Sequence, residues 1–146
     1  MNFTIHPMNE ADRETVHAMM RTFYASPAVL TNGSEAIFTA DIDACVSDNP
    51  YLEGYLFRRG DAVLGYGMAA KSFSTEFGKP CVWIEDLYVC PEYRGQGIGS
   101  GFLGYMARRH PNAILRLEVE AENERAIAVY EKSGFEVLPY MEMKRE

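Results

Sequence analysis

The sequence predicts an α/β (α+β) domain with a mixed, mostly antiparallel sheet of about six to seven strands and about four helices on its faces. Three observations predict it: apolar residues recur at helical spacing in four stretches, they alternate with polar residues in the others, and turn-forming residues separate the stretches. The element order is β-α-α-β-β-β-α-β-α-β. A length of 146 residues suits one compact core, so 1–146 is taken as a single domain.

The chain is predicted to begin with one short strand and two helices. Apolar and polar residues alternate over 3–6, and Pro7 ends that strand. Asn9 is a good N-cap for a helix over about 9–24, and a second helix is expected over about 34–46 after a Ser-Pro break and an Asn-Gly-Ser turn.

Three consecutive antiparallel strands should follow. The alternation over 53–57, 63–70 and 81–89 is typical of strands, and Gly-Asp and Gly-Lys-Pro turns separate them.

The C-terminal part is predicted to alternate between helices and strands. A helix over 97–109 and a strand over 113–120 follow the strand 81–89, and this step is a right-handed crossover that joins parallel strands. Asn123 should cap a helix to about residue 132, with Gly134 as its C′ residue. A final strand is expected through Phe135, Val137 and Met141 or Met143.

The charge balance argues against nucleic acid or a membrane surface as a partner. The formal net charge is −7, from 21 acidic and 14 basic side chains, so the average field repels phosphates and attracts cations. A cationic small molecule fits this field better than DNA. A homodimer is possible, since nothing in the sequence decides between a monomer and a dimer.

Cysteine and histidine usage indicates neither a disulfide framework nor a metal site. Cys45, Cys81 and Cys90 form no C-x-x-C pair, and the three histidines are scattered. Thiols kept reduced in the cytoplasm are the simplest interpretation. No leader-like or membrane-spanning apolar run occurs, so we expect a cytoplasmic protein. From the scattered cysteines and histidines we expect no metal.

The run Arg94-Gly95-Gln96-Gly97-Ile98-Gly99-Ser100 is the strongest functional signal. Glycines at a helix start let a ligand approach the backbone, and the unpaired first-turn amides bind phosphate oxygens, with Arg94 as an added charge. Two other phosphate loops are excluded, because no Lys precedes Ser100 and because Ser100 stands where the dinucleotide pattern needs a glycine. The alternative is that the glycines only permit close packing.

Two motifs resemble those of the GCN5-related N-acetyltransferase (GNAT) superfamily. The stretch 83–100, WIEDLYVCPEYRGQGIGS, contains Arg94-x-x-Gly97-x-Gly99, similar to the signature Gln/Arg-x-x-Gly-x-Gly/Ala. The run 123–135, NERAIAVYEKSGF, is similar to the second motif. The residues of these motifs are most similar to those of spermidine/spermine-type small-amine acetyltransferases. The Trp-rich C-terminal segment of the animal polyamine enzymes is absent here.

The resemblance implies a GNAT-like fold and an enzyme that uses acetyl-CoA as co-substrate. Residues 81–137 would form the acetyl-CoA core, and 1–80 the acceptor side. The main chain of one strand end would pair with the pantetheine arm, and the glycine-loop amides would hold the pyrophosphate. The implied cofactor-binding residues are Leu87, Tyr88, Val89, Arg94, Gly95, Gln96, Gly97, Ile98, Gly99, Ser100, Asn123 and Tyr130.

The implied reaction is direct attack of a primary amine on the acetyl group in a ternary complex. An amine with a pKa of about 10 must lose a proton. Glu85 is the first candidate for the base, directly or through a water, and Asp86 the alternative, because adjacent strand residues face opposite sides unless a bulge intervenes. Tyr130 is the candidate acid for the leaving sulfur. Ordinary surface carboxylates and a core tyrosine are the competing interpretations.

The acceptor pocket is expected in the N-terminal half. Tyr24, Ser26, Pro27 and Phe38 are candidate wall residues together with Glu85, and Glu35, Asp41 and Asp43 could attract a cation. The acceptor would be a small cationic molecule or a peptide. The alternative from another class is a non-catalytic acyl-CoA-binding sensor or regulatory domain.

Overall fold

The computed structural model describes residues 1–146 as one five-stranded sheet between two layers of helices. The strand order follows the chain, and all neighbouring pairs are antiparallel except the parallel pair β4–β5. The predicted parallel pairing of the two strands that flank α3 is therefore confirmed. The strands are β1 (Thr4–Pro7), β2 (Leu52–Arg59), β3 (Ala62–Ser74), β4 (Lys79–Val89) and β5 (Ile114–Leu117).

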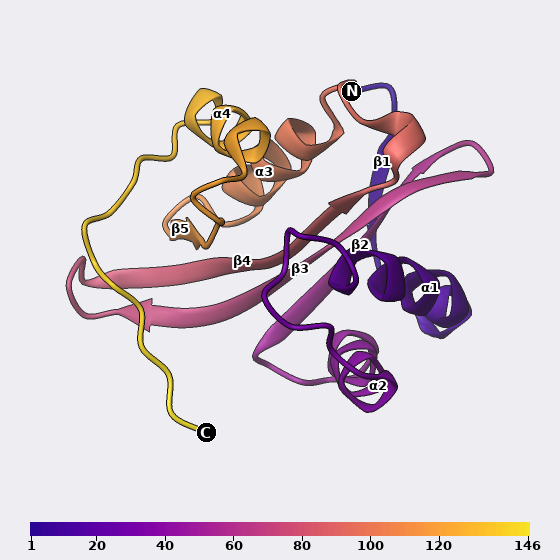
Figure 1. The fold of residues 1–146 in the computed structure, drawn as a ribbon, viewed down its shortest axis with the longest axis horizontal. Helices are drawn as coiled ribbons and strands as arrows, with labels where there is room; N and C mark the ends of the chain where they lie inside the picture. The colour runs from indigo at the N-terminus through magenta and orange to yellow at the C-terminus, as the bar shows by residue number, and fades with distance from the viewer.

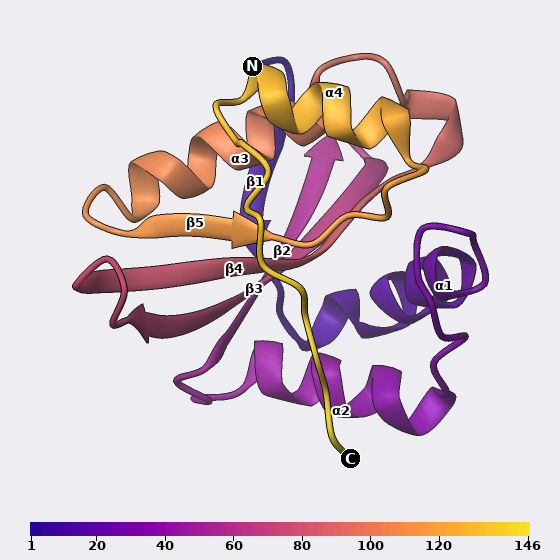
Figure 2. The same ribbon diagram turned by 60° about the vertical axis from the view of Figure 1, so that its left-hand side comes forward.

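Four α-helices cover the sheet, two on each face, as Figure 2 shows. They are α1 (Arg13–Tyr24), α2 (Glu35–Val46), α3 (Ile98–Arg109) and α4 (Glu124–Lys132), with short 3-10 turns at Glu10–Asp12 and Pro91–Tyr93. No helix is both long and apolar enough to cross a membrane.

Local capping explains where the helices begin and end. Asn9 accepts a hydrogen bond from the Ala11 amide and donates its own amide to Asp12, which starts the helical stretch that was predicted there. At the end of α4, Gly134 has φ +94°, and the Phe135 amide donates to the Tyr130 carbonyl at 3.0 Å. This C-terminal motif confirms Gly134 as the C′ residue.

Each face of the sheet has its own apolar core. Phe102 and Met106 of α3 pack with Tyr55 and Phe57 on one face. On the other face, α1 and α2 pack on a cluster that includes Tyr66 and Tyr88. β4 therefore contributes to both cores: some of its side chains point toward α1 and α2, and those on its other face support α3.

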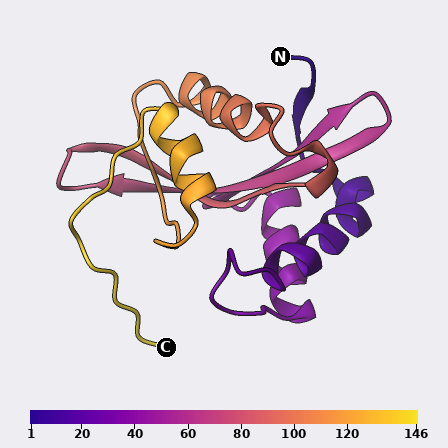
Figure 3. The same cartoon turned by 45° about the horizontal axis from the view of Figure 1, so that its top comes forward.

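The prediction of a sixth strand was wrong. Residues after Gly134 form no strand, and Val137, Met141 and Met143 are exposed. Pro139 cannot donate to a sheet, and the acidic run that follows β5 would face further glutamates of the tail. β5 is also shorter than expected and ends at Leu117. Figure 3 shows the tail passing from the α4 side of the sheet to the α1 and α2 side.

Candidate active site

A cavity of about 440 Å³ opens where β4 and β5 separate. Their pairing stops at Ile84 and Leu117, although β4 continues to Val89. The segment after α1 closes one side of the cavity, α4 contributes Tyr130, and the C-terminal tail contributes Glu142. The last residues of β4 consequently have one edge without a strand partner, beside a cavity.

A β-bulge brings Glu85 and Asp86 to the same cavity. Met68 pairs with Asp86 and Ala69 pairs with Ile84, so Glu85 is the extra residue on β4. A bulge breaks the alternation of side chains along a strand. Both carboxylates line the cavity, as the sequence allowed only with a bulge.

The two carboxylates have different surroundings. Asp86 is only 4% exposed, and its two oxygens accept hydrogen bonds from Tyr24 at 2.9 Å and Tyr66 at 2.7 Å. Burial raises the pKa of Asp86, and the two hydroxyl donors oppose that rise. Glu85 is exposed at the cavity wall and makes no hydrogen bond within the protein, so its oxygens are free to meet a ligand.

The cavity wall concentrates negative charge. Loss of hydration raises the pKa of Glu85 above its ordinary value, and Asp86, Asp41 and Glu142 add repulsion. The neighbouring carboxyl of Glu142, together with burial, raises the pKa of Glu118 to about 7. Burial and Asp86 raise the pKa of Asp41 to about 6. A cation in the cavity would relieve this repulsion.

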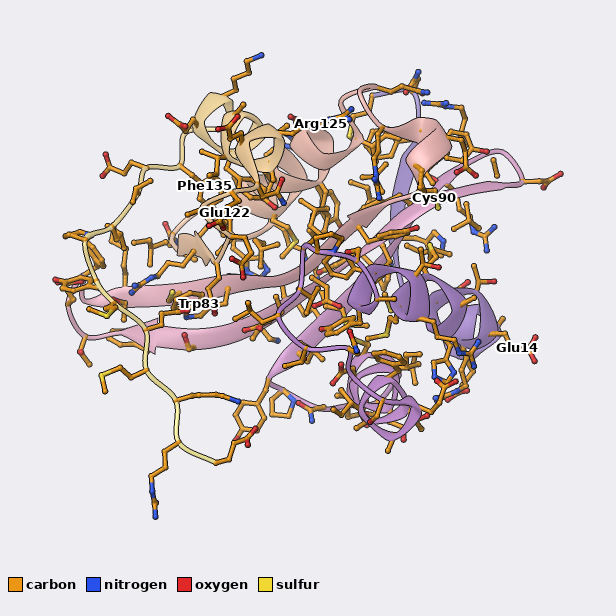
Figure 4. All side chains as sticks on the ribbon, viewed as in Figure 1. Glu14, Trp83, Cys90, Glu122, Arg125 and Phe135 are labelled. Atoms are coloured by element: carbon orange, nitrogen blue, oxygen red, sulfur yellow. The ribbon has the colours of Figure 1, made fainter.

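Tyr130 lines the cavity from α4, which covers the opposite face of the sheet from α1 and α2. Its ring packs against Phe135 with a centroid distance of 6.2 Å, and partial burial raises the pKa of its hydroxyl. That hydroxyl has no hydrogen-bond partner in the protein and remains a neutral donor near pH 7. Figure 4 shows Phe135 next to α4, on the tail that follows the helix.

The glycine loop presents six unused backbone amides. The first backbone bond of α3 runs from the Gly101 amide to the Gly97 carbonyl, and the amides of residues 95–100 donate to no protein acceptor. Gly95 and Gly97 have φ values of +78° and +79°, and a Cβ on Gly97 would meet nothing within 4 Å. Free amides at a helix start in open space can bind an anion.

Several side chains predicted at this loop are occupied within the protein. Arg94 donates through Nε to the Val89 carbonyl at 2.9 Å and covers the Tyr88 ring, so it does not stand free beside the loop as expected. Gln96 accepts from Arg59, and the side chain of Asn123 caps α4 through the Ala126 amide. The Asn123 carboxamide nitrogen is still free to donate to a ligand.

The predicted acceptor wall is only partly assembled in the cavity. Tyr24 and Glu85 line it, but Ser26 hydrogen-bonds to the Phe23 carbonyl, and Phe38, which is 3% exposed, packs behind Tyr24 in the core. Pro27 also lies outside the lining. Of the predicted acids, Glu35 pairs with Arg21 and Asp43 pairs with Arg13, whereas Asp41 lies near Asp86.

Sequence reasoning missed the acidic wall after β5. Glu118 and Glu120 line the cavity, although the alternation with Leu117 and Val119 predicts only a solvent-facing strand edge. No feature of the sequence indicated that Glu142 would line the cavity, because its segment was expected to form a strand. The structure contains no group of three or more side chains arranged to hold a metal, and the three cysteines are unpaired.

The family model of the Acetyltransferase (GNAT) family matches residues 15–135. This chain belongs to that family. A thialysine N-epsilon-acetyltransferase of Bos taurus is 42% identical over 79 residues, which are 52% of this chain and 46% of that protein. The corresponding protein of Mus musculus is 38% identical, with the same shares covered. The match thus spans less than half the length of these curated relatives.

Solved structures of this fold cover the whole chain. A possible acetyltransferase from Clostridium difficile 630 has a TM-score of 0.84 at 22% identity, over 100% of this chain and 98% of that one. An aminoglycoside N-acetyltransferase, AAC(6′)-Iy, in complex with CoA has a TM-score of 0.82 at 16% identity, over 99% and 94%. These likenesses show that the family member described here has the fold predicted from its sequence.

Proposed function

We propose that this chain is an acetyl-CoA-dependent N-acetyltransferase that acts on a primary amine of a small cationic molecule or peptide. The observation that carries the proposal is a single cavity with a carboxylate wall on one side and the open edge of β4 on another. The strand end leads into six free amides at the start of α3. The named relatives, which are N-acetyltransferases, support the same activity.

The residues present fit the coenzyme. The free amides of 95–100 would bind its diphosphate, because no side chain fills the space above Gly97. The main chain of Leu87 to Val89, apart from the Val89 carbonyl that accepts from Arg94, would pair with the pantetheine amides along the open edge. When bound, the coenzyme supplies an acetyl group that is activated as a thioester.

Glu85 would accept the proton of the attacking amine. Its raised pKa makes it a stronger base than an ordinary glutamate, and no protein donor occupies its oxygens. Asp86 would act differently: fixed between Tyr24 and Tyr66, it would hold the cavity wall in shape and add negative charge. That charge would draw a cationic acceptor toward Glu85.

The test of this function is release of free thiol from acetyl-CoA in the presence of an amine panel. The panel contains polyamines, amino acids, aminoglycosides and short peptides. We expect acceptor-dependent thiol release with a cationic member of the panel. Tight binding of CoA without thiol release for any acceptor would instead indicate the non-catalytic sensor.

Tyr130→Phe is expected to lower kcat about ten- to a hundredfold. The hydroxyl has no partner in the protein, so it can protonate the sulfur as that atom leaves. The effect should lie at the lower end for a positioned acid, because a thiolate with a reference pKa of about 8.5 is already a tolerable leaving group. CoA affinity and the thermal midpoint should stay unchanged. Normal turnover with a lowered midpoint would show a packing role only.

A further inference from the structure

Arg125 reaches the glycine loop from another helix. It is the second residue of α4, and its Nη2 atom lies 3.5 Å from the position that a Cβ on Gly95 would occupy. Figure 4 shows Arg125 at the side of α4 that faces α3. A cation from the second motif of the chain thus stands beside the free amides of the first.

No partner within the protein neutralises this guanidinium. Arg125 is exposed and forms no hydrogen bond or ion pair, even with the adjacent Glu124. By contrast, Arg94 is bound to the Val89 carbonyl, and Arg59 is bound to Gln96 and Asn2. Arg125 is therefore the arginine near the loop whose donors are all available to a ligand.

The position of Arg125 is unfavourable for its own helix. The N-terminal turn is the positive end of a helix dipole, where cations are destabilising. Arg125 adds positive charge there, close to the equally positive start of α3. In a protein with a net charge of −7, this local concentration of positive potential suits an anion rather than helix stability.

We infer that Arg125 binds a phosphate oxygen of the coenzyme diphosphate, closing the glycine loop from the side of α4. The inference rests on the proposed use of acetyl-CoA. It specifies the diphosphate rather than the 3′-phosphate, because Gly95 belongs to the loop whose amides would receive the diphosphate. A planar guanidinium can donate two hydrogen bonds to such a group.

The test is titration calorimetry with CoA and with 3′-dephospho-CoA on wild type, Arg125→Gln and the control Lys132→Gln. Lys132 is an exposed cation at the other end of α4. We expect Arg125→Gln to weaken both ligands by the same factor, about tenfold for one exposed charge-assisted contact. Its thermal midpoint should be unchanged or slightly higher, because a cation leaves the helix start. Lys132→Gln should bind both ligands as wild type does.

Two results would overturn the assignment. Loss of CoA affinity without loss of 3′-dephospho-CoA affinity would place Arg125 at the 3′-phosphate, and unchanged affinity for both would remove it from the site. Failure of the proposed function looks different: a protein that does not use the coenzyme would bind neither ligand as wild type, and a non-catalytic sensor would bind both but release no thiol with any amine.

Discussion

Gly97→Glu should abolish measurable acetyl-CoA binding while leaving a folded protein. Gly97 has φ +79°, a Cβ there would point into open space, and the residue lies within the run 95–100, whose amides have no protein acceptor. A carboxylate at this point would occupy the volume of the diphosphate and repel its charge. We expect affinity to fall by more than about a hundredfold, which corresponds to roughly 2.7 kcal/mol, in equilibrium binding measurements.

The matched control is Gly78→Glu in the turn between β3 and β4. Gly78 also has a positive φ, +64°, and open space around its Cβ position, but it lies away from the glycine loop. Both variants place a non-glycine residue at a positive φ, with a backbone strain of order 1–2 kcal/mol. Equal losses of affinity in the two would show that strain, rather than the loop, determines binding, and full affinity in a folded Gly97→Glu protein would refute the site.

The sequence predicted the fold well where local signals and burial agree. Asn9 caps the start of the first helical stretch and Gly134 ends α4, as expected, because a cap and a C′ glycine depend only on residues a few positions away. The tail shows the limit of this reasoning. Val137, Met141 and Met143 have the spacing of a strand, but pairing depends on a neighbouring edge, and β5 provides only four residues.

The site was predictable in its backbone and less so in its side chains. The glycine loop is where the motif placed it, because glycine and a helix start determine that geometry locally. Which group a long side chain contacts depends on the tertiary structure and not on its neighbours in the sequence. Arg94 bends back to the Val89 carbonyl, and Arg125, which had no role in the sequence-based hypothesis, comes to the loop instead.

The bulge in β4 is a backbone feature that determines where two side chains of the site point. Without it, Glu85 and Asp86 would face opposite sides of the sheet, and one of them could not reach the acceptor. The register shift gives both access to one cavity but leaves them in different environments. One carboxylate accepts hydrogen bonds from two tyrosine hydroxyls, and the other is free, which suits the first to the proposed positioning role and the second to the proposed proton-accepting role.

Glu85→Gln should lower kcat/KM by about 10² to 10³ at neutral pH, near the size expected for loss of a positioned base. A base works only when deprotonated, so wild-type activity should fall as the pH drops through the raised pKa of Glu85. This fall of activity at low pH, the acidic limb of the profile, should be missing in Glu85→Gln. The deficit should shrink as the pH approaches the amine pKa of about 10, because the solvent then deprotonates the acceptor. The measurement is kcat/KM against pH.

The paired variant, Asp86→Asn, should cost less activity than Glu85→Gln and should keep the acidic limb. The carboxamide oxygen introduced by this change would still accept a hydrogen bond from one tyrosine, so the cavity wall should be retained with a lower thermal midpoint. This contrast tests the role that the bulge gives to each carboxylate. If Asp86→Asn removes the limb and Glu85→Gln keeps it, the base is Asp86, and the exposed glutamate merely adds charge to the cavity.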